Sequence, residues 1–288
     1  MRSFLYVPGN RPQMLASALR RGADAIIVDL EDAVPPAEKD AARAAVATWL
    51  ADQQPDAPIF VRVNVGDRGV DDARAVVAPA VRGLVVAKAS PDQLSAVTAV
   101  LDDLDPAGAV SLVPLLETPQ AILAAAAMAH APRVARLQIG EADLAAELGV
   151  ALGEDERELL FVRSAVVLAS AAAGLDPPAA AVTTDFRDLD ALRRTTLALK
   201  RLGFRGRACI HPAQLPVVHD VFTPTPAEVA EARDLIARFA AAGGGVCLDA
   251  RGRMVDQAVV RDARRVLALA VGETAGNRLS RPGSGPIL

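Results

Sequence analysis

Three carboxylates follow a single apolar run near the N-terminus of the 288-residue chain, in the stretch Asp29-Leu30-Glu31-Asp32. Like charges at this spacing repel one another unless cations or hydrogen-bond donors neutralise them. A helix cap followed by solvated acids is the simpler interpretation. The functional interpretation rests on Asp29, because it stands before the apolar run breaks and is expected to point inward. The cluster is therefore a candidate binding or catalytic site.

One arginine occurs where a strand could carry it toward these acids. In the segment Ile59–Asn64, strand alternation puts Arg62 on the same side as Asn64 and opposite the valines. An arginine on the polar side of a strand end needs an anion to offset its loss of hydration. Two roles follow for Arg62: a structural ion pair with the acids at residues 29–32, or a donor to a substrate carbonyl or carboxylate.

Two further carboxylates follow later strand-like segments. Glu117 comes directly after an apolar run and before Pro119, which suits the first turn of a helix. Asp143 follows Gly140, where glycine would let the backbone approach a ligand closely, and a helix cap is the alternative role for this aspartate. Two convergent carboxylates with open positions suit Mg2+, which prefers oxygen ligands. Glu117 and Asp143 are therefore predicted to bind Mg2+.

Other kinds of catalytic chemistry have weaker support. The three histidines, His130, His211 and His219, show no metal-ligand spacing, and no GxSxG motif occurs. His211 precedes Pro212, so it either faces the site or caps the next helix. Lys88 at a strand end could form a Schiff base, but pairing with an acid is the favoured interpretation.

Composition narrows the class of partner. The formal charge is −4 and aromatic residues make up 3% of the chain, so neither charge nor base stacking favours nucleic acid. No run approaches the roughly 18 apolar residues of a membrane-spanning helix. The first residues, MRSFLYVPGN, fit a strand better than a signal peptide. Cys209 and Cys247 are predicted to be buried free thiols, which favours a reducing, cytoplasmic location.

Short β-branched runs alternate with longer amphipathic segments, which predicts an α/β fold, specifically a (β/α)8 TIM barrel. The absence of GxGxxG and GxxxxGK[ST] disfavours an open nucleotide-binding sheet. The predicted strands are Ser3–Val7, Ala25–Leu30, Ile59–Asn64, Gly83–Lys88, Val110–Leu116, Arg136–Ile139, Ala180–Thr184 and Arg207–Ile210. The main predicted helices are Arg11–Arg21, Ala37–Leu50, Pro91–Leu104, Pro119–Ala129 and Asp188–Leu202, with two more around Asp143–Leu148 and Glu154–Gly174.

The chain after the eighth predicted strand has a different pattern. We predict that residues 1–225 form the barrel and residues 226–288 a C-terminal helical extension or lid. This extension comprises a helix at Pro226–Ala242, a glycine run, a short strand at Val246–Asp249 and a helix at Asp256–Val271. The tail Gly272–Leu288, rich in glycine and proline, is predicted to be mobile. We expect an appendage of the barrel, not an independent domain.

The candidate residues fall within ordered motifs that span nearly the whole chain. These motifs include Val7-Pro8-Gly9, Asp29-Leu30-Glu31-Asp32-Ala33-Val34, Arg62-Val63-Asn64, Glu117-Thr118-Pro119, Gly140-Glu141-Ala142-Asp143-Leu144 and Ile210-His211-Pro212-Ala213-Gln214. Taken together they resemble the HpcH/HpaI aldolase and citrate lyase beta-subunit superfamily, and specifically its CitE-like branch. The first acidic motif alone would be weak support.

The resemblance implies a Mg2+-dependent enzyme that acts on acyl thioesters of coenzyme A or of an acyl carrier protein. Glu117 and Asp143 would be the metal ligands. Arg62 would bind carbonyl oxygens of the substrate, and the acids Glu31 and Asp32 would support it in the catalytic site.

The same resemblance extends to the substrate contacts. It implies that Gly140 and Leu144 lie at the substrate beside the metal ligands. For the coenzyme A moiety, position alone makes Arg2, Arg11 and Lys39 candidates.

A lid in related proteins carries an acid within a Met-Ile/Val-Asp stretch that reaches the active site of a neighbouring subunit. Here Met254-Val255-Asp256 matches that stretch, which makes Asp256 the candidate acid/base. Relatives often continue with a Pro-His pair, from which this chain departs at Gln257 and Ala258. The resemblance also implies a homo-oligomer, a trimer or hexamer, in which subunits exchange lids.

The leading functional hypothesis is a carbon–carbon lyase. It would split a short 3-hydroxyacyl thioester, such as malyl-, citramalyl- or citryl-CoA, into a small oxo acid and a second thioester. Three alternatives stay open at this point: a malyl-CoA-type thioesterase, a free-acid aldolase of the HpcH type, and a citrate lyase subunit that needs partner subunits.

Overall fold

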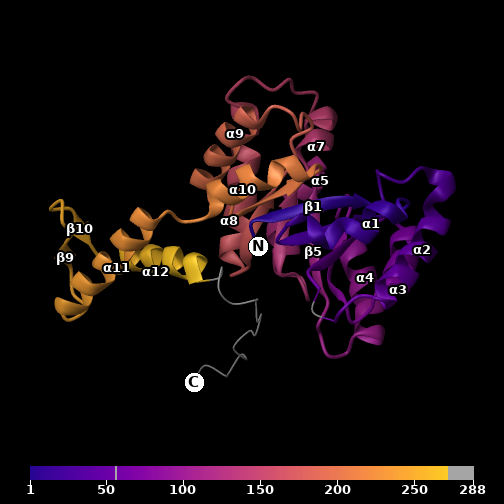
Figure 1. Ribbon diagram of the computed structural model, residues 1–288, viewed down its shortest axis with the longest axis horizontal. Coiled ribbons are helices and arrows are strands. Elements are labelled where there is room, and N and C mark those ends of the chain that lie inside the picture. Colours follow the sequence, from indigo (N-terminus) through magenta and orange to yellow (C-terminus); the bar gives the residue numbers. More distant parts are fainter. Residues whose placement is uncertain (56, 272–288) are drawn as a thin grey trace. The chain divides into compact units, whose positions relative to one another are not determined.

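Eight parallel strands close into a barrel in the computed structural model, which describes residues 1–55 and 57–271 (Figure 1). Each strand pairs with the next along the chain, and β8 returns to pair with β1. The prediction of a (β/α)8 barrel is confirmed. The strands are β1 (Ser3–Pro8), β2 (Ala25–Asp29), β3 (Ile59–Val63), β4 (Val81–Val86), β5 (Ser111–Leu116), β6 (Arg136–Ile139), β7 (Asp176–Ala180) and β8 (Gly206–Cys209).

Helices connect successive strands around the outside of the barrel, as Figure 1 shows for α2, α3 and α4. Short 3-10 turns at Leu19–Arg21, Pro36–Glu38, Arg157–Leu159 and Pro212–Gln214 supplement them. The helices of this part are α1 (Pro12–Ala18), α2 (Lys39–Ala51), α3 (Asp67–Val76), α4 (Pro91–Leu104), α5 (Pro119–Leu123), α6 (Ala125–Ala129), α7 (Glu141–Leu148), α8 (Leu160–Ala172), α9 (Leu189–Leu202) and α10 (Leu215–Phe222).

The two faces of each strand bury different residues. On β2, Ile26 and Val28 face the helices and join the large outer core, whereas Ala25 and Ile27 face the lumen. The lumen cluster is small and continues with Phe4, Phe60, Val85, Val113, Leu115 and Ala179. Strand alternation therefore carries Asp29 and Arg62 inward, at the carboxyl ends of β2 and β3, where active sites of such barrels lie.

The predicted position of the seventh strand, Ala180–Thr184, is wrong. The strand runs from Asp176 to Ala180 and includes Pro177 and Pro178, which lack the N–H that a sheet ladder uses. The ladder between β6 and β7 is irregular at this point, with a register shift between Arg136 and Gln138. Residues after Ala180 instead form a loop on the barrel's carboxyl-end face.

Two further predictions need correction in detail. The predicted helix Pro119–Ala129 is divided at Ala124 into α5 and α6, whose shared boundary residue leaves the helical conformation. The region Glu154–Gly174 begins with a 3-10 turn at Arg157–Leu159, and α8 follows it. The helix α4 has the predicted bounds, with a Ser90 side-chain cap and Pro91 in its first turn.

The chain divides into two compact units, Met1–Phe222 and a second that begins at Thr223. The described part of the second unit contains α11 (Pro226–Ala241), an antiparallel pair of β9 (Cys247–Leu248) and β10 (Met254–Val255), and α12 (Gln257–Val271). A small core of its own is formed by Phe239, Val255 and Val260. The predicted boundary after residue 225 and the role as a lid stay predictions, and the tail 272–288 lies outside the described residues.

Two smaller predictions concern the thiols and the membrane. Cys209 and Cys247 are both free, as predicted, and Cys209 is buried whereas Cys247 is half-buried. Among the helices of residues 1–55 and 57–271, none is long and apolar enough to cross a membrane.

Candidate active site

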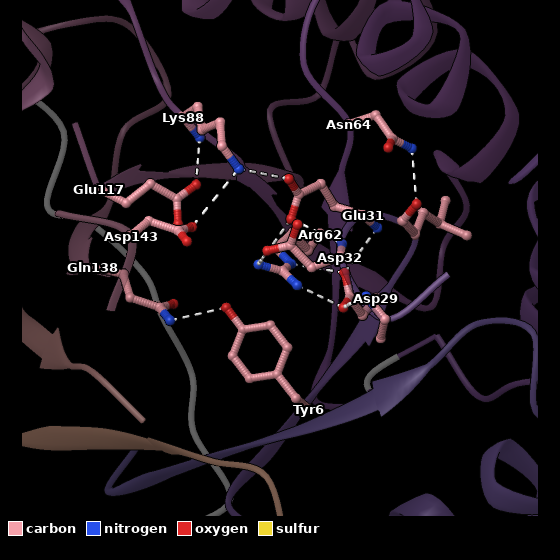
Figure 2. A network of polar contacts seen from close by, with 12 residues as sticks. Tyr6, Asp29, Glu31, Asp32, Arg62, Asn64, Lys88, Glu117, Gln138 and Asp143 are labelled. Atoms are coloured by element: carbon pink, nitrogen blue, oxygen red, sulfur yellow. Dashed lines mark hydrogen bonds and ion pairs between the residues drawn. The ribbon is translucent and has the colours of Figure 1, made fainter. Parts of the chain in front are cut away.

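A cavity of about 430 Å3 opens among the carboxyl ends of the strands. Most of its polar lining comes from residues that the sequence singled out, and Figure 2 shows them converging. The lining residues are Tyr6, Pro8, Asp29, Asp32, Ala33, Arg62, Leu115, Glu117, Gln138, Ile139, Gly140, Glu141, Ala142, Asp143, Ala181, Val182 and Ile210.

Asp29 and Arg62 form a buried bidentate ion pair across β2 and β3. Arg62 donates from Nε to Asp29 Oδ1 at 2.7 Å and from Nη2 to Oδ2 at 2.6 Å. The backbone N–H groups of Glu31 and Ala33 donate to the same carboxylate. Asp29 therefore has its acceptor sites filled, and this geometry fixes the plane of the guanidinium.

The remaining Arg62 donors face two more acids and the cavity. Nη1 lies 3.0 Å from Glu31 Oε2 and 3.4 Å from Asp32 Oδ2, and the guanidinium carbon lies 5.0 Å from the centre of the Tyr6 ring. Burial opposes the charge, but the hydrogen bond to Asp29 raises the pKa of Arg62, so the group stays cationic. Of the five N–H donors of an arginine, these contacts leave one on Nη2 without an acceptor among the residues that the structure describes. The predicted ion pair is thus present, and one donor is left for a ligand.

Lys88 lies just beyond the end of β4 and contacts acids on both sides of it, Glu31 and Asp143. Its Nζ lies 2.9 Å from Glu31 Oε1 and 3.7 Å from Asp143 Oδ2. Burial alone would lower the pKa of Lys88, but the hydrogen bond and charge of Glu31 raise it. A Schiff base needs a neutral amine, so the favoured interpretation, pairing with an acid, is confirmed.

The backbone of Lys88 also positions Glu117. With φ of +43°, Lys88 occupies the left-handed region that non-glycine residues rarely adopt. Its N–H donates to Glu117 Oε1 at 2.7 Å. The Glu117 side chain is also packed against Gly140, where an added Cβ would lie 2.7 Å from Glu117 Oε2. Glycine at position 140 therefore makes room for the Glu117 side chain, whereas the predicted close approach to a ligand stays a prediction.

Glu117 is a buried carboxylate, and it has no ion pair within 4 Å among residues 1–55 and 57–271. It is 2% exposed, and burial raises its pKa to about 7, which the Lys88 N–H and charge offset only in part. Asp143, in the first turn of α7, lines the same cavity, and Figure 2 shows the two carboxylates together beside Lys88. The donor set consists of oxygen atoms from two side chains. It fits a hard cation such as Mg2+ that keeps water or substrate oxygens as its other ligands.

No group of three or more His, Cys, Asp or Glu side chains that could hold a metal occurs in residues 1–55 and 57–271. A protein-only cage such as a structural zinc site is therefore not built from the described residues. A site with two carboxylates and open positions does not need such a group.

Some site residues were not predicted from the sequence. Tyr6 lies at the floor of the cavity, where Gln138 Nε2 donates to its hydroxyl oxygen at 3.0 Å (Figure 2). Burial raises the pKa of Tyr6 well above its usual value. The signal for Gln138 was available: it is a polar residue in a strand, two positions before Gly140, and so shares its face.

Two candidates for coenzyme A contacts, Arg2 and Lys39, have partners within the protein, and their contact with coenzyme A stays a prediction. Arg2 precedes β1, at the opposite end of the barrel from the cavity, and pairs with Asp24 at 2.9 Å. Lys39 donates to the backbone oxygens of Leu30 and Glu31 and to Asn64 Oδ1. Lys39 thus links the backbone of the acidic segment at residues 29–32 to Asn64. Arg11 is exposed just after β1 and stays a candidate.

Three other singled-out residues have structural contacts. Leu144 is fully buried in the outer core and does not line the cavity, so its predicted contact with substrate has no support in the structure. His211 Nδ1 accepts from the Ala213 N–H, which makes it a helix cap, and its ring stacks on Phe186. Asp256 caps α12 by accepting from two backbone N–H groups. Its acid/base role stays a prediction.

Comparison with known proteins agrees with this site. Residues 2–212 match the HpcH/HpaI aldolase/citrate lyase family. A citrate lyase subunit beta-like protein of Deinococcus radiodurans is 32% identical over 283 residues, covering 93% of this chain and 96% of the relative. A (3S)-malyl-CoA thioesterase of Cereibacter sphaeroides is 37% identical over 277 residues, covering 93% of this chain and 94% of the relative.

A solved structure of CitE from Mycobacterium tuberculosis, in complex with magnesium, acetoacetate and coenzyme A, is similar over 93% of this chain and 97% of that one. The TM-score is 0.77 and the sequence identity 29%. The fold, the ordered motifs and these similarities agree, and the chain belongs to the HpcH/HpaI aldolase/citrate lyase family.

Proposed function

We propose that this protein is a Mg2+-dependent carbon–carbon lyase that cleaves, or forms, a short 3-hydroxyacyl thioester such as malyl-, citramalyl- or citryl-CoA. The observation that carries the proposal is the pairing of two carboxylates, Glu117 and Asp143, with the fixed guanidinium of Arg62 around one cavity. The similar CitE protein binds magnesium, acetoacetate and coenzyme A, which supports the same classes of ligand here.

The residues that would hold Mg2+ are Glu117 and Asp143. When bound, the ion supplies a template and Lewis acid for the oxygens of the oxo-acid part. The Lys88 ammonium lies 3.7 Å from Asp143, the Lys88 backbone N–H donates to Glu117, and the Lys88 charge lowers the pKa of Glu117. Lys88 offsets the mutual repulsion of the two carboxylates and so holds them close together before a ligand arrives.

The chemistry requires negative charge to move onto oxygen. A general base takes the proton of the hydroxyl group of the 3-hydroxyacyl thioester, and the adjacent carbon–carbon bond breaks. The products are an oxo acid and a thioester enolate, whose carbon is then protonated. Arg62, held rigid by Asp29, would direct its remaining N–H at the oxygen where charge develops. Such fixed donors usually make the largest single contribution to the rate.

Protonation of the enolate carbon needs an acid, and Asp256 is the proposed one. It would act from the lid of a neighbouring subunit in a homotrimer or hexamer, with the lid excluding water. If water entered instead, the same site would hydrolyse the thioester.

A thioesterase is the second candidate function, because a (3S)-malyl-CoA thioesterase is 37% identical to this chain. Cleavage of the thioester and cleavage of the carbon–carbon bond give different products. Purified protein is to be incubated with Mg2+ and each of malyl-, citramalyl- and citryl-CoA, with free thiol, thioester and oxo acid quantified separately. Release of acetyl-CoA and an oxo acid supports the lyase, whereas free coenzyme A with the intact hydroxy acid supports the thioesterase.

Citrate lyase beta subunits are also similar, such as that of Escherichia coli, at 34% identity. A subunit that needs partners would give neither product alone. Turnover by the single purified chain therefore separates a free-standing enzyme from a partner-dependent subunit.

A further inference from the structure

Helix α7 carries the candidate metal ligand Asp143 but has few anchors of its own. It spans eight residues, Glu141–Leu148, and buries only Leu144. Its N-cap, Gly140, has no side chain that could accept a hydrogen bond from the first turn. Helices of two turns are marginal without tertiary contacts. Apart from the 3.7 Å contact of Asp143 with Lys88, the position of Asp143 therefore depends on what holds the first turn of α7.

A buried arginine on the neighbouring helix α8 contacts that turn. Arg163, whose side chain is 4% exposed, donates to both oxygens of Glu141, each at 2.6 Å. Its Nη2 also donates to Glu156 Oε2 at 2.7 Å. Glu141 is the first residue of α7, two positions before Asp143, so the bidentate bond fixes the turn that carries the ligand.

The two partners of Arg163 are the two ends of one segment. Glu141 begins the excursion between β6 and α8, and Glu156 closes it just before the 3-10 turn that leads into α8. Glu156 has φ of +51°, a conformation that costs energy for a non-glycine residue. A single guanidinium thus closes residues 141–156 into a loop at its base.

We propose that Arg163 is a positioning residue that clamps the segment Glu141–Glu156 at both ends and thereby holds Asp143 at the metal site. The part of this inference that concerns metal rests on the proposed function. Arg163 itself does not line the cavity, so it acts through α7 and not by contact with substrate.

The test is the variant Arg163→Lys, which keeps the positive charge but loses the fork of donors. Mg2+ alone is titrated into the intact protein by calorimetry. We expect the Kd for Mg2+ to rise about 10-fold or more, the size usual for residues that orient a metal ligand. Glu156→Gln, which removes one end of the clamp only, should weaken binding in the same direction but less. It also serves as the readout if Arg163→Lys does not fold.

A matched control is Arg133→Lys. Arg133 is likewise one arginine held between two carboxylates, Asp102 and Asp105, each at 2.9 Å. It lies before β6, at the amino-terminal end of the strands. Its substitution should leave the Kd for Mg2+ unchanged.

Hydrogen exchange of the metal-free protein separates this inference from the proposed function. Amides of residues 141–148 should exchange faster in Arg163→Lys than in wild type, and no faster in Arg133→Lys. If the amides of residues 141–148 exchange at the wild-type rate in Arg163→Lys, Arg163 does not clamp this segment, whatever the Kd for Mg2+. If wild type binds Mg2+ and Arg163→Lys binds it equally well, the clamp does not position Asp143. If wild type does not bind Mg2+ but exchange is faster in Arg163→Lys, the proposed metal site is wrong and the clamping role of Arg163 is supported.

Discussion

At the scale of single residues, the site is organised by one buried cation. Arg62 pairs with Asp29 through two parallel hydrogen bonds and also meets Glu31 and Asp32. A buried ion pair of this kind is weak support for stability, because desolvation opposes it. The ion pair with Asp29 instead orients Arg62, because a guanidinium fixed in its plane can direct one N–H at a substrate oxygen.

Substitution of Arg62 by lysine tests whether the fixed orientation of the guanidinium matters for catalysis. Arg62→Lys keeps the charge but cannot form the two parallel bonds with Asp29. We expect kcat to fall about 100-fold, the usual loss for one fixed donor to a developing oxyanion. Steady-state kinetics on the preferred thioester checks this. Arg68→Lys, which alters an exposed pair with Asp40, is the matched control and should keep wild-type kcat. Equal losses in both variants would contradict the role of Arg62.

The buried thiol gives a pH dependence with a defined sign. Burial raises the pKa of Cys209 from 9.0 to about 12. Between those values the unfolded chain loses a proton that the folded protein keeps, so the free energy of unfolding falls as pH rises, by at most about 1.4 kcal/mol per pH unit. Cys209→Ala should therefore lose less stability than wild type between pH 9 and pH 11 in urea unfolding. Between pH 7 and pH 8 the difference between the two proteins should stay constant. If the free energies of unfolding of Cys209→Ala and wild type change in parallel over the whole pH range, folding does not raise the pKa of Cys209.

Much of the site was predictable at this scale because alternation along a strand is a local rule. It placed Asp29 and Arg62 inward, and the strand-end positions of Glu117 and Asp143 led to one cavity. The role of Lys88 was only half predictable, because its partners lie on three different elements. The pair of Tyr6 and Gln138 also depends on closure of the barrel, which brings residues 132 positions apart into contact.

At the scale of elements, the loop after β7 is held by another buried arginine, Arg207. Arg207 on β8 has no carboxylate partner among the contacts of the described residues. It donates to the Ala181 backbone oxygen and to hydroxyls of Thr183, Thr195 and Thr196. Ala181 lines the cavity. Arg207 therefore ties one wall of the site to α9.

Loss of this tie should change binding more than chemistry. In Arg207→Lys, the wall at Ala181 is free to move while Arg62, Glu117 and Asp143 keep their contacts. We expect KM for the thioester to rise about 10-fold with kcat changed less than threefold, the pattern for lost uniform binding. Full steady-state kinetics separates the two constants. A fall in kcat at constant KM would assign Arg207 to the chemical step instead.

The errors in the predicted elements share a physical cause. Proline normally argues against a strand, so a strand that contains Pro177 and Pro178 is not expected from residue types. The irregular ladder with β6 tolerates them, and this can be known only from the neighbouring strand. The division of the Pro119–Ala129 region into α5 and α6 likewise has no breaker residue at Ala124 to signal it.

At the scale of the whole molecule, the chain combines a barrel that holds the polar site with a second unit that has its own small core. If that unit is a lid, Asp256 is needed for turnover but not for Mg2+ binding. We expect Asp256→Asn to lower kcat at least 100-fold, within the range that general acid catalysis contributes, and to leave the Kd for Mg2+ unchanged. The helix-cap contacts of Asp256 alone predict that Asp256→Ala loses about 1 kcal/mol in stability with little change in kcat. Asp256→Asn and Asp256→Ser can still cap the helix, so wild-type kcat in these two variants would contradict the acid role.

The most direct test of the central claim is Mg2+-dependent release of an oxo acid from a 3-hydroxyacyl thioester by the purified chain. Malyl-, citramalyl- and citryl-CoA are offered in Mg2+ and then in EDTA, with Glu117→Gln as the variant that lacks one candidate ligand. We predict oxo acid and acetyl-CoA from at least one substrate in Mg2+, none in EDTA, and at least 100-fold less with the variant. Equal oxo-acid release in Mg2+ and EDTA, or free coenzyme A without any oxo acid, would contradict the account.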